Sequence, residues 1–148
     1  MKTAALITHS HPPSATEAVK VAAEVAHELG WRLAASEDEL EKHGPAAEGV
    51  DVTAEHTLPE ICLVLGGDGS ILHALRRYAH TEVPVFGVNF GTVGFLAAVE
   101  RDDAEVGIRR AFAGETEEID LPALAIEIDG TEGFALNDVS FSRRPHDR

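Results

Sequence analysis

The stretch "ICLVLGGDGSILHALRRY", residues 61–78, combines three kinds of local pattern in a short segment. Its aliphatic run at residues 61–65 predicts a buried strand, and the periodicity from about Ser70 to His80 predicts a helix. Between them, three glycines surround Asp68. A tight turn needs one or two glycines, so the turn raises the question of what the additional glycine is for.

Further strands are predicted wherever short apolar runs occur in the first 114 residues. The runs are residues 4–8, 31–35 and 84–89, with at most a short strand at residues 50–53 in an otherwise loop-like segment, residues 45–60. Helical patterns separate these runs. The alternation predicts an α/β fold, with an open, mostly parallel sheet and flanking helices.

Helix boundaries are predicted from a Ser or Asp followed three residues later by Glu, and from a glycine at the end of each periodic segment. The pairs, each with its terminal glycine, are Ser14 and Glu17 with Gly30, Ser36 and Glu39 with Gly44, and Asp102 and Glu105 with Gly114. The acidic run "SEDELE", residues 36–41, is interpreted as the solvated exterior of the second helix.

The pattern changes after Gly114. Leu124, Ile126 and Ile128 recur at every second position, an Asp-Gly turn follows, and a second alternating run continues through Val139 and Phe141. This predicts a β-hairpin, which is marginally stable by itself. We therefore expect an α/β nucleotide-binding domain at residues 1–114 and the first strands of a truncated β-rich domain at residues 115–148.

Composition narrows the classes of partner. The 148 residues include 12 Lys and Arg against 26 Asp and Glu, a net charge of −14. Such a charge argues against nucleic acid or an anionic membrane as a partner. A small anionic ligand remains possible, because backbone N–H groups at a helix start can bind phosphate.

The cysteine and histidine residues predict neither an intrachain disulfide nor a metal site. Cys62 is the only cysteine, so no intrachain disulfide can form, and its apolar run predicts burial. No apolar run reaches the length of a membrane span, and a cytoplasmic protein is expected. Of eight histidines only His9 and His11 are close together, and without a third ligand nearby no metal site is predicted.

The turn "GGDGS", residues 66–70, is the first candidate for chemistry. Its glycines allow close backbone approach to a phosphate, yet a simple turn with Asp68 capping the next helix explains them equally well. Neither the G-x-x-x-x-G-K-[ST] nor the G-x-G-x-x-G nucleotide signature is present. Asp68 is suited to take a proton from a hydroxyl or to reach a phosphate-bound Mg²⁺.

Two other motifs are weak signals by themselves. "GVNFGTVGFL", residues 87–96, has glycines around Asn89 and ends in the apolar residues Phe95 and Leu96. Both glycine-rich turns follow predicted strands, at the edge where open α/β sheets bind ligands. Asn137 and Asp138 combine an amide and a carboxylate, which suit a ribose diol, although a solvated edge or a bulge is the simpler interpretation.

Taken together and in this order, "GGDGS", "GVNFGTVGFL" and "ALND" make the chain resemble the N-terminal half of the NAD kinase family, over about residues 4–141. The first motif is shared with diacylglycerol kinases and phosphofructokinases. The second and third motifs narrow the resemblance to the NAD kinase family. It implies transfer of the γ-phosphoryl group of ATP, or of polyphosphate, to the 2′-hydroxyl of the adenosine ribose of NAD. The product would be NADP, with Mg²⁺ as cofactor.

The resemblance also implies roles for individual residues. Asp68 matches the aspartate that activates the 2′-hydroxyl. The residues implied in binding ATP or NAD are Gly67, Gly69, Ser70, Asn89, Phe95, Asn137 and Asp138. Ser70 replaces the family's commoner Thr and Asp138 its commoner Glu, and both keep the functional group. A homo-oligomer is expected on the same basis.

Family members continue into a β-rich domain with a G-S-T-A-Y type motif, which does not occur in this sequence. Full activity is therefore expected to need that domain or a partner chain. Two other hypotheses stay open: a non-catalytic module that binds a nucleotide or a partner protein, and a kinase of the wider superfamily that acts on another hydroxyl.

Overall fold

The computed structural model describes residues 1–9, 15–53, 58–92, 94–136 and 138–140. The chain forms two compact units, Met1–Glu117 and Glu118–Arg148. Each is described by itself.

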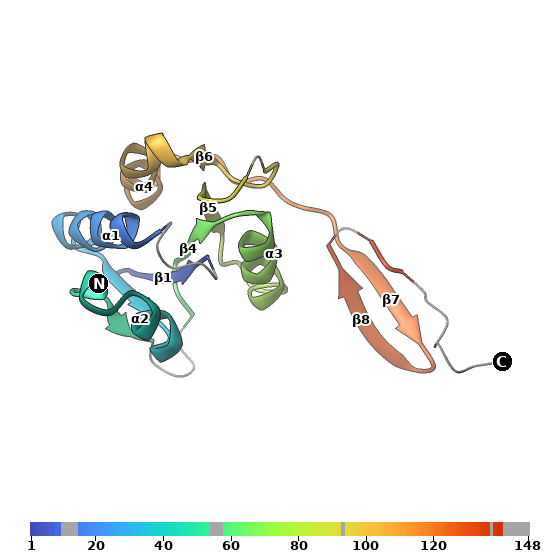
Figure 1. The fold of residues 1–148 in the computed structure, drawn as a ribbon. Helices are drawn as coiled ribbons and strands as arrows, with labels where there is room; N and C mark the ends of the chain where they lie inside the picture. Colours follow the sequence, from blue (N-terminus) through green and yellow to red (C-terminus); the bar gives the residue numbers. More distant parts are fainter. Residues whose placement is uncertain (10–14, 54–57, 93, 137, 141–148) are drawn as a thin grey trace. The chain divides into compact units, whose positions relative to one another are not determined.

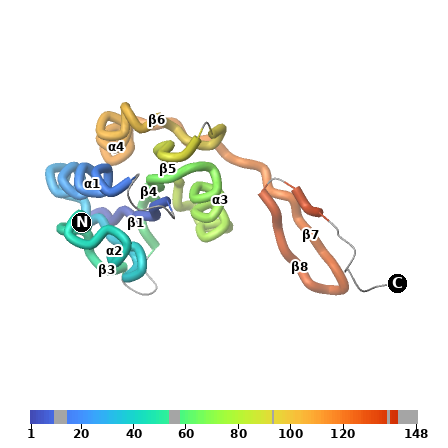
Figure 2. Tube along the Cα trace, in the orientation of Figure 1, coloured from blue at the N-terminus to red at the C-terminus, as the bar shows by residue number. Residues whose placement is uncertain are grey.

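A six-stranded parallel sheet forms the centre of the first unit, in the order β3-β2-β1-β4-β5-β6. The strands are β1 (Thr3–Thr8), β2 (Arg32–Ala35), β3 (Asp51–Val52), β4 (Ile61–Gly66), β5 (Val85–Asn89) and β6 (Val99–Glu100). The predicted α/β class with an open parallel sheet is confirmed. Figure 2, which labels β3, lets the chain be followed from strand to strand.

The strand order reverses between β1 and β4. The chain places β2 and β3 on one side of β1 and then crosses over to place β4 on the other side. The register pairs Thr8 with Leu65 and Gly66 with Asn89, so the carboxyl ends of β1, β4 and β5 lie level. Ligands of open α/β sheets bind at such a reversal, beyond the carboxyl ends of the strands.

Helices cover both faces of the sheet. They are α1 (Thr16–Glu28), α2 (Glu37–His43), α3 (Asp68–Arg77) and α4 (Ala104–Ala113), with 3₁₀ turns η2 (Gly44–Ala47) and η3 (Arg101–Asp103). Leu63 and Leu65 of β4 pack in one core with α1 and α4, while Cys62 and Val64 pack in a second core with α3. Figure 1 shows α1 and α4 together on one side of the strands and α3 on the other.

The predicted start of α2 is confirmed. The Ser36 hydroxyl accepts a hydrogen bond from the backbone N–H of Glu39 at 3.3 Å, and Gly44 ends the helix. The start of α1 differs from the prediction, because Ala15 occupies the N-cap and makes no side-chain cap bond. Ser14 lies outside the described residues.

The predicted start of α4 at Asp102 is wrong. Asp102 belongs to η3, and Asp103 is the N-cap of α4 without a side-chain cap bond. Glu105 binds Arg109 instead of the helix start, with Arg109 Nε 3.0 Å from Glu105 Oε1. Gly114 ends the helix in the left-handed conformation, as predicted.

Helix α3 starts and ends earlier than the sequence predicts. Gly67 is its N-cap, and the Gly67 carbonyl accepts from the N–H groups of Ser70 and Ile71, so Asp68 is already helical. The helix ends before His80, whose φ of 62° is incompatible with its continuation. This earlier start places Asp68 in the first turn of the helix.

The second unit contains a β-hairpin, as predicted. Strands β7 (Leu124–Ile128) and β8 (Thr131–Ala135) pair antiparallel. Asp129 and Gly130, with φ of 51° and 77°, form the turn, as expected for a type I′ connection. The second strand is shorter than predicted: β8 ends at Ala135, Val139 follows outside any strand, and residue 141 lies outside the described residues.

Across the described part of the chain, no helix is both long and apolar enough to span a membrane.

Candidate functional site

The two glycine-rich turns meet through one carboxylate. Asp68 Oδ2 accepts a hydrogen bond from the backbone N–H of Phe95 at 3.1 Å, and Asp68 Oδ1 accepts one from that of Leu96 at 3.2 Å. The Asp68 side chain therefore fastens the second turn to the first, rather than capping its own helix. The turns are brought together because both follow adjacent parallel strands, β4 and β5.

Glycines in the second turn make this contact possible. A Cβ atom on Gly94 would lie 2.5 Å from Asp68 Oδ1, and one on Gly91 would lie 3.3 Å from the Cα atom of Gly67. Neither distance leaves room for a side chain without a shift of the neighbouring atoms. These two glycines are explained by the close approach of one turn to the other.

The glycines of the first turn serve different purposes. A Cβ atom on Gly66 would lie 2.6 Å from Ser70 Oγ, so that position is closed by the chain's own packing. A Cβ atom on Gly69 would meet nothing within 4 Å. Packing therefore explains Gly66, whereas Gly69 leaves open space beside exposed backbone.

Asn89 is engaged within the protein. It is 4% exposed, its Nδ2 donates to Glu100 Oε2 at 3.0 Å, and its Oδ1 accepts from the backbone N–H of Gly91 at 3.0 Å. The amide thus shapes the start of the second turn. Phe95, in contrast, is 94% exposed while its backbone is held by Asp68, so its ring is available for stacking.

The third motif lies in the hairpin unit. Asp138 is exposed and lies beyond the end of β8, so the prediction that the second strand continues past it, through Val139, is wrong. Asn137 lies outside the described residues.

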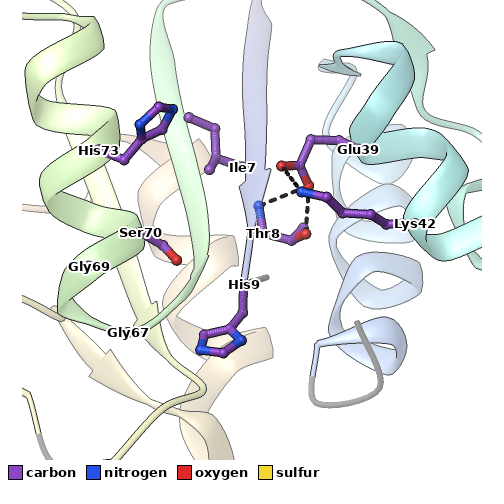
Figure 3. A pocket seen from close by; sticks show the side chains of 9 residues that line it. All are labelled: Ile7, Thr8, His9, Glu39, Lys42, Gly67, Gly69, Ser70 and His73. Carbon is purple, nitrogen blue, oxygen red and sulfur yellow. Dashed lines mark hydrogen bonds and ion pairs between the residues drawn. The ribbon is translucent and has the colours of Figure 1, made fainter. Parts of the chain in front are cut away.

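A cavity of about 410 Å³ lies at the reversal of strand order between β1 and β4. It is lined by the end of β1, one side of α2 and the start of α3, namely Ile7, Thr8, His9, Glu39, Lys42, Gly67, Gly69, Ser70 and His73. Figure 3 shows Glu39 and Lys42 on α2 and Ser70 and His73 on α3, on opposite sides of Thr8.

Glu39 connects α2 to the end of β1. The pairing of β1 with β2 ends at Ala5 and Ala34, so Thr8 extends beyond its neighbour on that side. Glu39 Oε2 accepts from the Thr8 backbone N–H at 3.2 Å and from the Thr8 hydroxyl at 2.6 Å. The side chain of Glu39 is only 13% exposed, so its interpretation as helix exterior is wrong.

Lys42 is the cationic side chain of the cavity. Its Nζ lies 2.7 Å from Glu39 Oε1, the oxygen that Thr8 leaves free. The Lys42 side chain is 33% exposed and lines the cavity.

His43, the last residue of α2, is buried and contacts Thr8 and Thr16. It is 5% exposed, with Nε2 2.8 Å from Thr8 Oγ1 and Nδ1 3.3 Å from Thr16 Oγ1. Because the Thr8 hydroxyl donates to Glu39, its oxygen accepts from the Nε2–H group of His43. Burial lowers the pKa of His43 below its ordinary value, and this effect exceeds the opposing attraction of Glu39.

The motifs did not reveal this network, because Thr8 and its partners on α2 are far apart in the sequence. Thr8 and Glu39 are separated by 31 positions and Thr8 and His43 by 35. The only available signal was the cap at Ser36, which fixes where α2 begins after β2. His9 also lines the cavity, while His11 lies outside the described residues.

Comparison with known proteins identifies the family. Residues 14–116, which include both glycine-rich turns, match the ATP-NAD kinase N-terminal domain. The chain belongs to the NAD kinase family. The resemblance predicted from the sequence motifs is thereby confirmed, although "ALND" lies beyond the matched residues.

Several bacterial NAD kinases are similar to this chain. The protein from Clostridium botulinum is 35% identical over 101 residues, which are 66% of this chain and 36% of the relative. The protein from Psychrobacter arcticus is 42% identical over 100 residues, or 62% of this chain and 31% of the relative. The matched part of this NAD kinase family member thus spans about a third of the length of these relatives.

Proposed function

We propose that this chain carries the phosphoryl-transfer half of an NAD kinase, an enzyme that moves the γ-phosphoryl group of ATP or polyphosphate to NAD and forms NADP. The acceptor would be the 2′-hydroxyl of the adenosine ribose. One observation carries the proposal: Asp68 joins the two glycine-rich turns at the carboxyl edge of the sheet. Relatives named NAD kinase match the same segment.

Asp68 is the proposed general base. A carboxylate offers about four lone-pair directions, and the N–H groups of Phe95 and Leu96 use two of them, so acceptor capacity remains for a hydroxyl proton. In the reaction, the 2′-hydroxyl passes its proton to Asp68 as its oxygen bonds to the γ-phosphorus, and ADP leaves. The two amides fix the direction of the carboxylate before substrate arrives, which is how positioning lowers a barrier.

Phosphate contact is proposed at the start of α3. Gly67 and Gly69 present backbone there, Gly69 leaves open space, and Ser70 adds a hydroxyl at the cavity. Donors of this kind stabilise phosphate at a helix start. Phosphoryl transfer depends mostly on such positioning and on charge neutralisation.

Contacts to the dinucleotide are proposed for the remaining motif residues. The exposed ring of Phe95 would stack on a base, and Asn137 with Asp138 would hold a ribose. Asn89 would act indirectly, by shaping the second turn. Mg²⁺ would arrive bound to the donor phosphates, as is usual for this ion in phosphoryl-transfer sites.

Full activity would also need the β-rich domain that the family resemblance implies, or a partner chain that supplies it. A homo-oligomer and a cytoplasmic location belong to the same proposal.

A chimera tests the function without depending on that remaining part. The first unit would replace the matched 100-residue segment of the Psychrobacter arcticus NAD kinase, and NADP formation from ATP, Mg²⁺ and NAD would be measured. The proposal predicts NADP formation by the chimera. A folded chimera that binds nucleotide but forms no NADP would contradict it, and phosphorylation of other hydroxyl acceptors would then be examined with the same protein.

A non-catalytic nucleotide-binding module is the second candidate, because both oxygens of Asp68 already accept hydrogen bonds from the second turn. Calorimetry on the 148-residue chain with ATP and with NAD distinguishes it. Binding without turnover, in both the chain and the chimera, would support the module. Turnover by the chimera would exclude it.

A further inference from the structure

The base of the second turn is closed by two consecutive pairs of residues. Glu100 Oε2 accepts a hydrogen bond from Asn89 Nδ2 at 3.0 Å. Beside this pair, Arg101 Nη2 lies 3.5 Å from the Phe90 carbonyl oxygen, and Arg101 Cζ lies 5.1 Å from the centre of the Phe90 ring. The residues of each pair are 11 positions apart, so the start of the turn is joined to the junction of β6 and η3 that follows it.

Backbone hydrogen bonds hold both ends of the turn to the sheet. The Phe90 N–H donates to the Gly66 carbonyl at 2.9 Å, which continues the pairing of β5 with β4. The Ala98 N–H donates to the Gly87 carbonyl at 2.8 Å, where the chain returns to β5 before it enters β6. The base of the turn is therefore part of the sheet, and the Asp68 carboxylate holds the turn at a second place.

Glu100 satisfies a buried group. Asn89 is 4% exposed, so its Nδ2 has little access to water once Glu100 is removed. The Oδ1 atom of the same amide accepts from the Gly91 N–H at 3.0 Å. A buried donor without a partner is costly, so the amide would turn toward water and release Gly91. Loss of Glu100 therefore loosens the turn where it leaves β5.

We propose that Glu100 and Arg101 are positioning residues for Asp68. Both act through the second turn: they fix its base, and the N–H groups of Phe95 and Leu96 then hold the carboxylate of Asp68. A carboxylate held in this way meets the acceptor hydroxyl in one orientation, whereas a loosened turn lets it rotate. The inference rests on the proposed function, in which Asp68 is the general base.

Glu105 is a matched control for Glu100. Its Oε1 accepts from Arg109 Nε at 3.0 Å, the distance found between Glu100 and Asn89, but it lies on α4. Each substitution to alanine removes one carboxylate and one hydrogen bond. Glu100→Gln is the conservative variant, because its side-chain carbonyl still accepts from Asn89 Nδ2.

Arg101 is compared with Arg110 in the same way. Arg110 Nη2 lies 3.3 Å from the Glu115 carbonyl oxygen at the end of α4. Substitution of either arginine by methionine removes one guanidinium contact with a backbone carbonyl. Arg101 is exposed, and a cation above an aromatic ring contributes modestly at such a site, so its effect should be smaller than that of Glu100.

The test is NMR spectroscopy of the 148-residue chain, which follows the backbone amides of Phe95 and Leu96. Glu100→Ala should speed their exchange with solvent by about tenfold, as expected when a buried donor loses its partner, and Arg101→Met by about two- to fivefold. Their proton signals should also move upfield, because their hydrogen bonds to Asp68 weaken. A loss of global stability alone would not move these signals in the folded protein.

The control variants should behave differently. Glu105→Ala and Arg110→Met should leave both amides as in the wild type, and Glu100→Gln should restore most of the protection. Thermal unfolding of each variant confirms that the comparison is between folded proteins. In the chimera, Glu100→Ala should lower kcat about tenfold while KM for ATP and for NAD stays within about twofold, because it affects the positioning of the base and not binding.

The proposal is overturned if Glu100→Ala leaves the Phe95 and Leu96 amides as Glu105→Ala does, or if it alters them without lowering the kcat of an active chimera. A parent chimera that forms no NADP, with amides that respond as expected, contradicts the proposed function alone. The positioning of the Asp68 carboxylate through the second turn would then stand.

Discussion

Strand β4 and the hairpin β7–β8 differ in how far their residues are buried. Every position of β4 is buried, whereas no position of β7 or β8 is. The turn that carries Asp68 therefore follows a strand held by two cores, and Asp138 follows a strand with no core of its own. Contacts within the first unit fix the geometry of "GGDGS" and "GVNFGTVGFL". The motif "ALND" needs further contacts to be positioned.

The largest expected effect comes from truncating the two regions in parallel. Leu63→Ala, at a position that is 0% exposed, should lower the free energy of unfolding by about 2–5 kcal/mol because it leaves a cavity. Ile128→Ala, at a position that is 48% exposed, should change it by less than about 0.5 kcal/mol. Urea unfolding followed by the fluorescence of Trp31, the only tryptophan, measures both.

Trp31 is suited to this measurement because it stacks on Phe112 at 5.0 Å inside the first unit. A loss for Ile128→Ala as large as that for Leu63→Ala would show that the hairpin is packed into the main core. That result would remove the contrast between the two regions.

An intermediate effect is expected within the first unit, where Gly94 and Gly69 can be compared. Gly94→Ala places a methyl group 2.5 Å from Asp68 Oδ1 and should destabilise the fold by about 1–3 kcal/mol through loss of the hydrogen bonds to Asp68. Gly69→Ala meets nothing within 4 Å and, in a helix, should be neutral or stabilise by up to about 1 kcal/mol.

At Gly69, phosphate binding and stability should respond to the same substitution in opposite directions. If its open space admits phosphate, Gly69→Ala should weaken tripolyphosphate binding while the midpoint of urea unfolding is unchanged or higher. Unchanged binding would show that phosphate does not approach this backbone. A stable Gly94→Ala variant would show that the second turn adjusts without cost.

Sequence patterns predicted most elements of the α/β unit, because these depend on local periodicity, but they missed the two-residue strand β6 and misplaced the starts of α3 and α4. They did not predict hydrogen bonds between side chains and residues that are distant in the sequence. Glu39 was expected on a solvated helix face and instead completes the end of β1 through Thr8. Asp68 was expected either to cap α3 or to face a ligand, and its bonds to the second turn depend on how adjacent strands are aligned.

The smallest expected effect is a dependence of stability on pH through His43. Burial lowers its pKa in the folded protein below the ordinary 6.5. Above that value the imidazole is neutral in both states. As pH falls through 6.5 toward the folded value, the unfolded chain takes up the proton first, so the free energy of unfolding decreases.

His43→Gln provides the comparison for this effect, since an amide keeps a donor for Thr8 and does not titrate. The unfolding temperatures of both proteins would be measured at about pH 7.5 and about pH 5.5. The wild-type protein should lose more stability on acidification than the variant. Equal losses would contradict a buried neutral His43.

The most direct test of the central claim is the rate of NADP formation by the chimera with Asp68 and with Asp68→Asn. Asparagine keeps the size of the side chain and one carbonyl acceptor but cannot act as the base. The rate should fall by about 10²–10⁴-fold, as expected for loss of a general base, while the variant remains folded. A folded Asp68→Asn chimera with a rate within about twofold of the parent would contradict the role of Asp68 as general base.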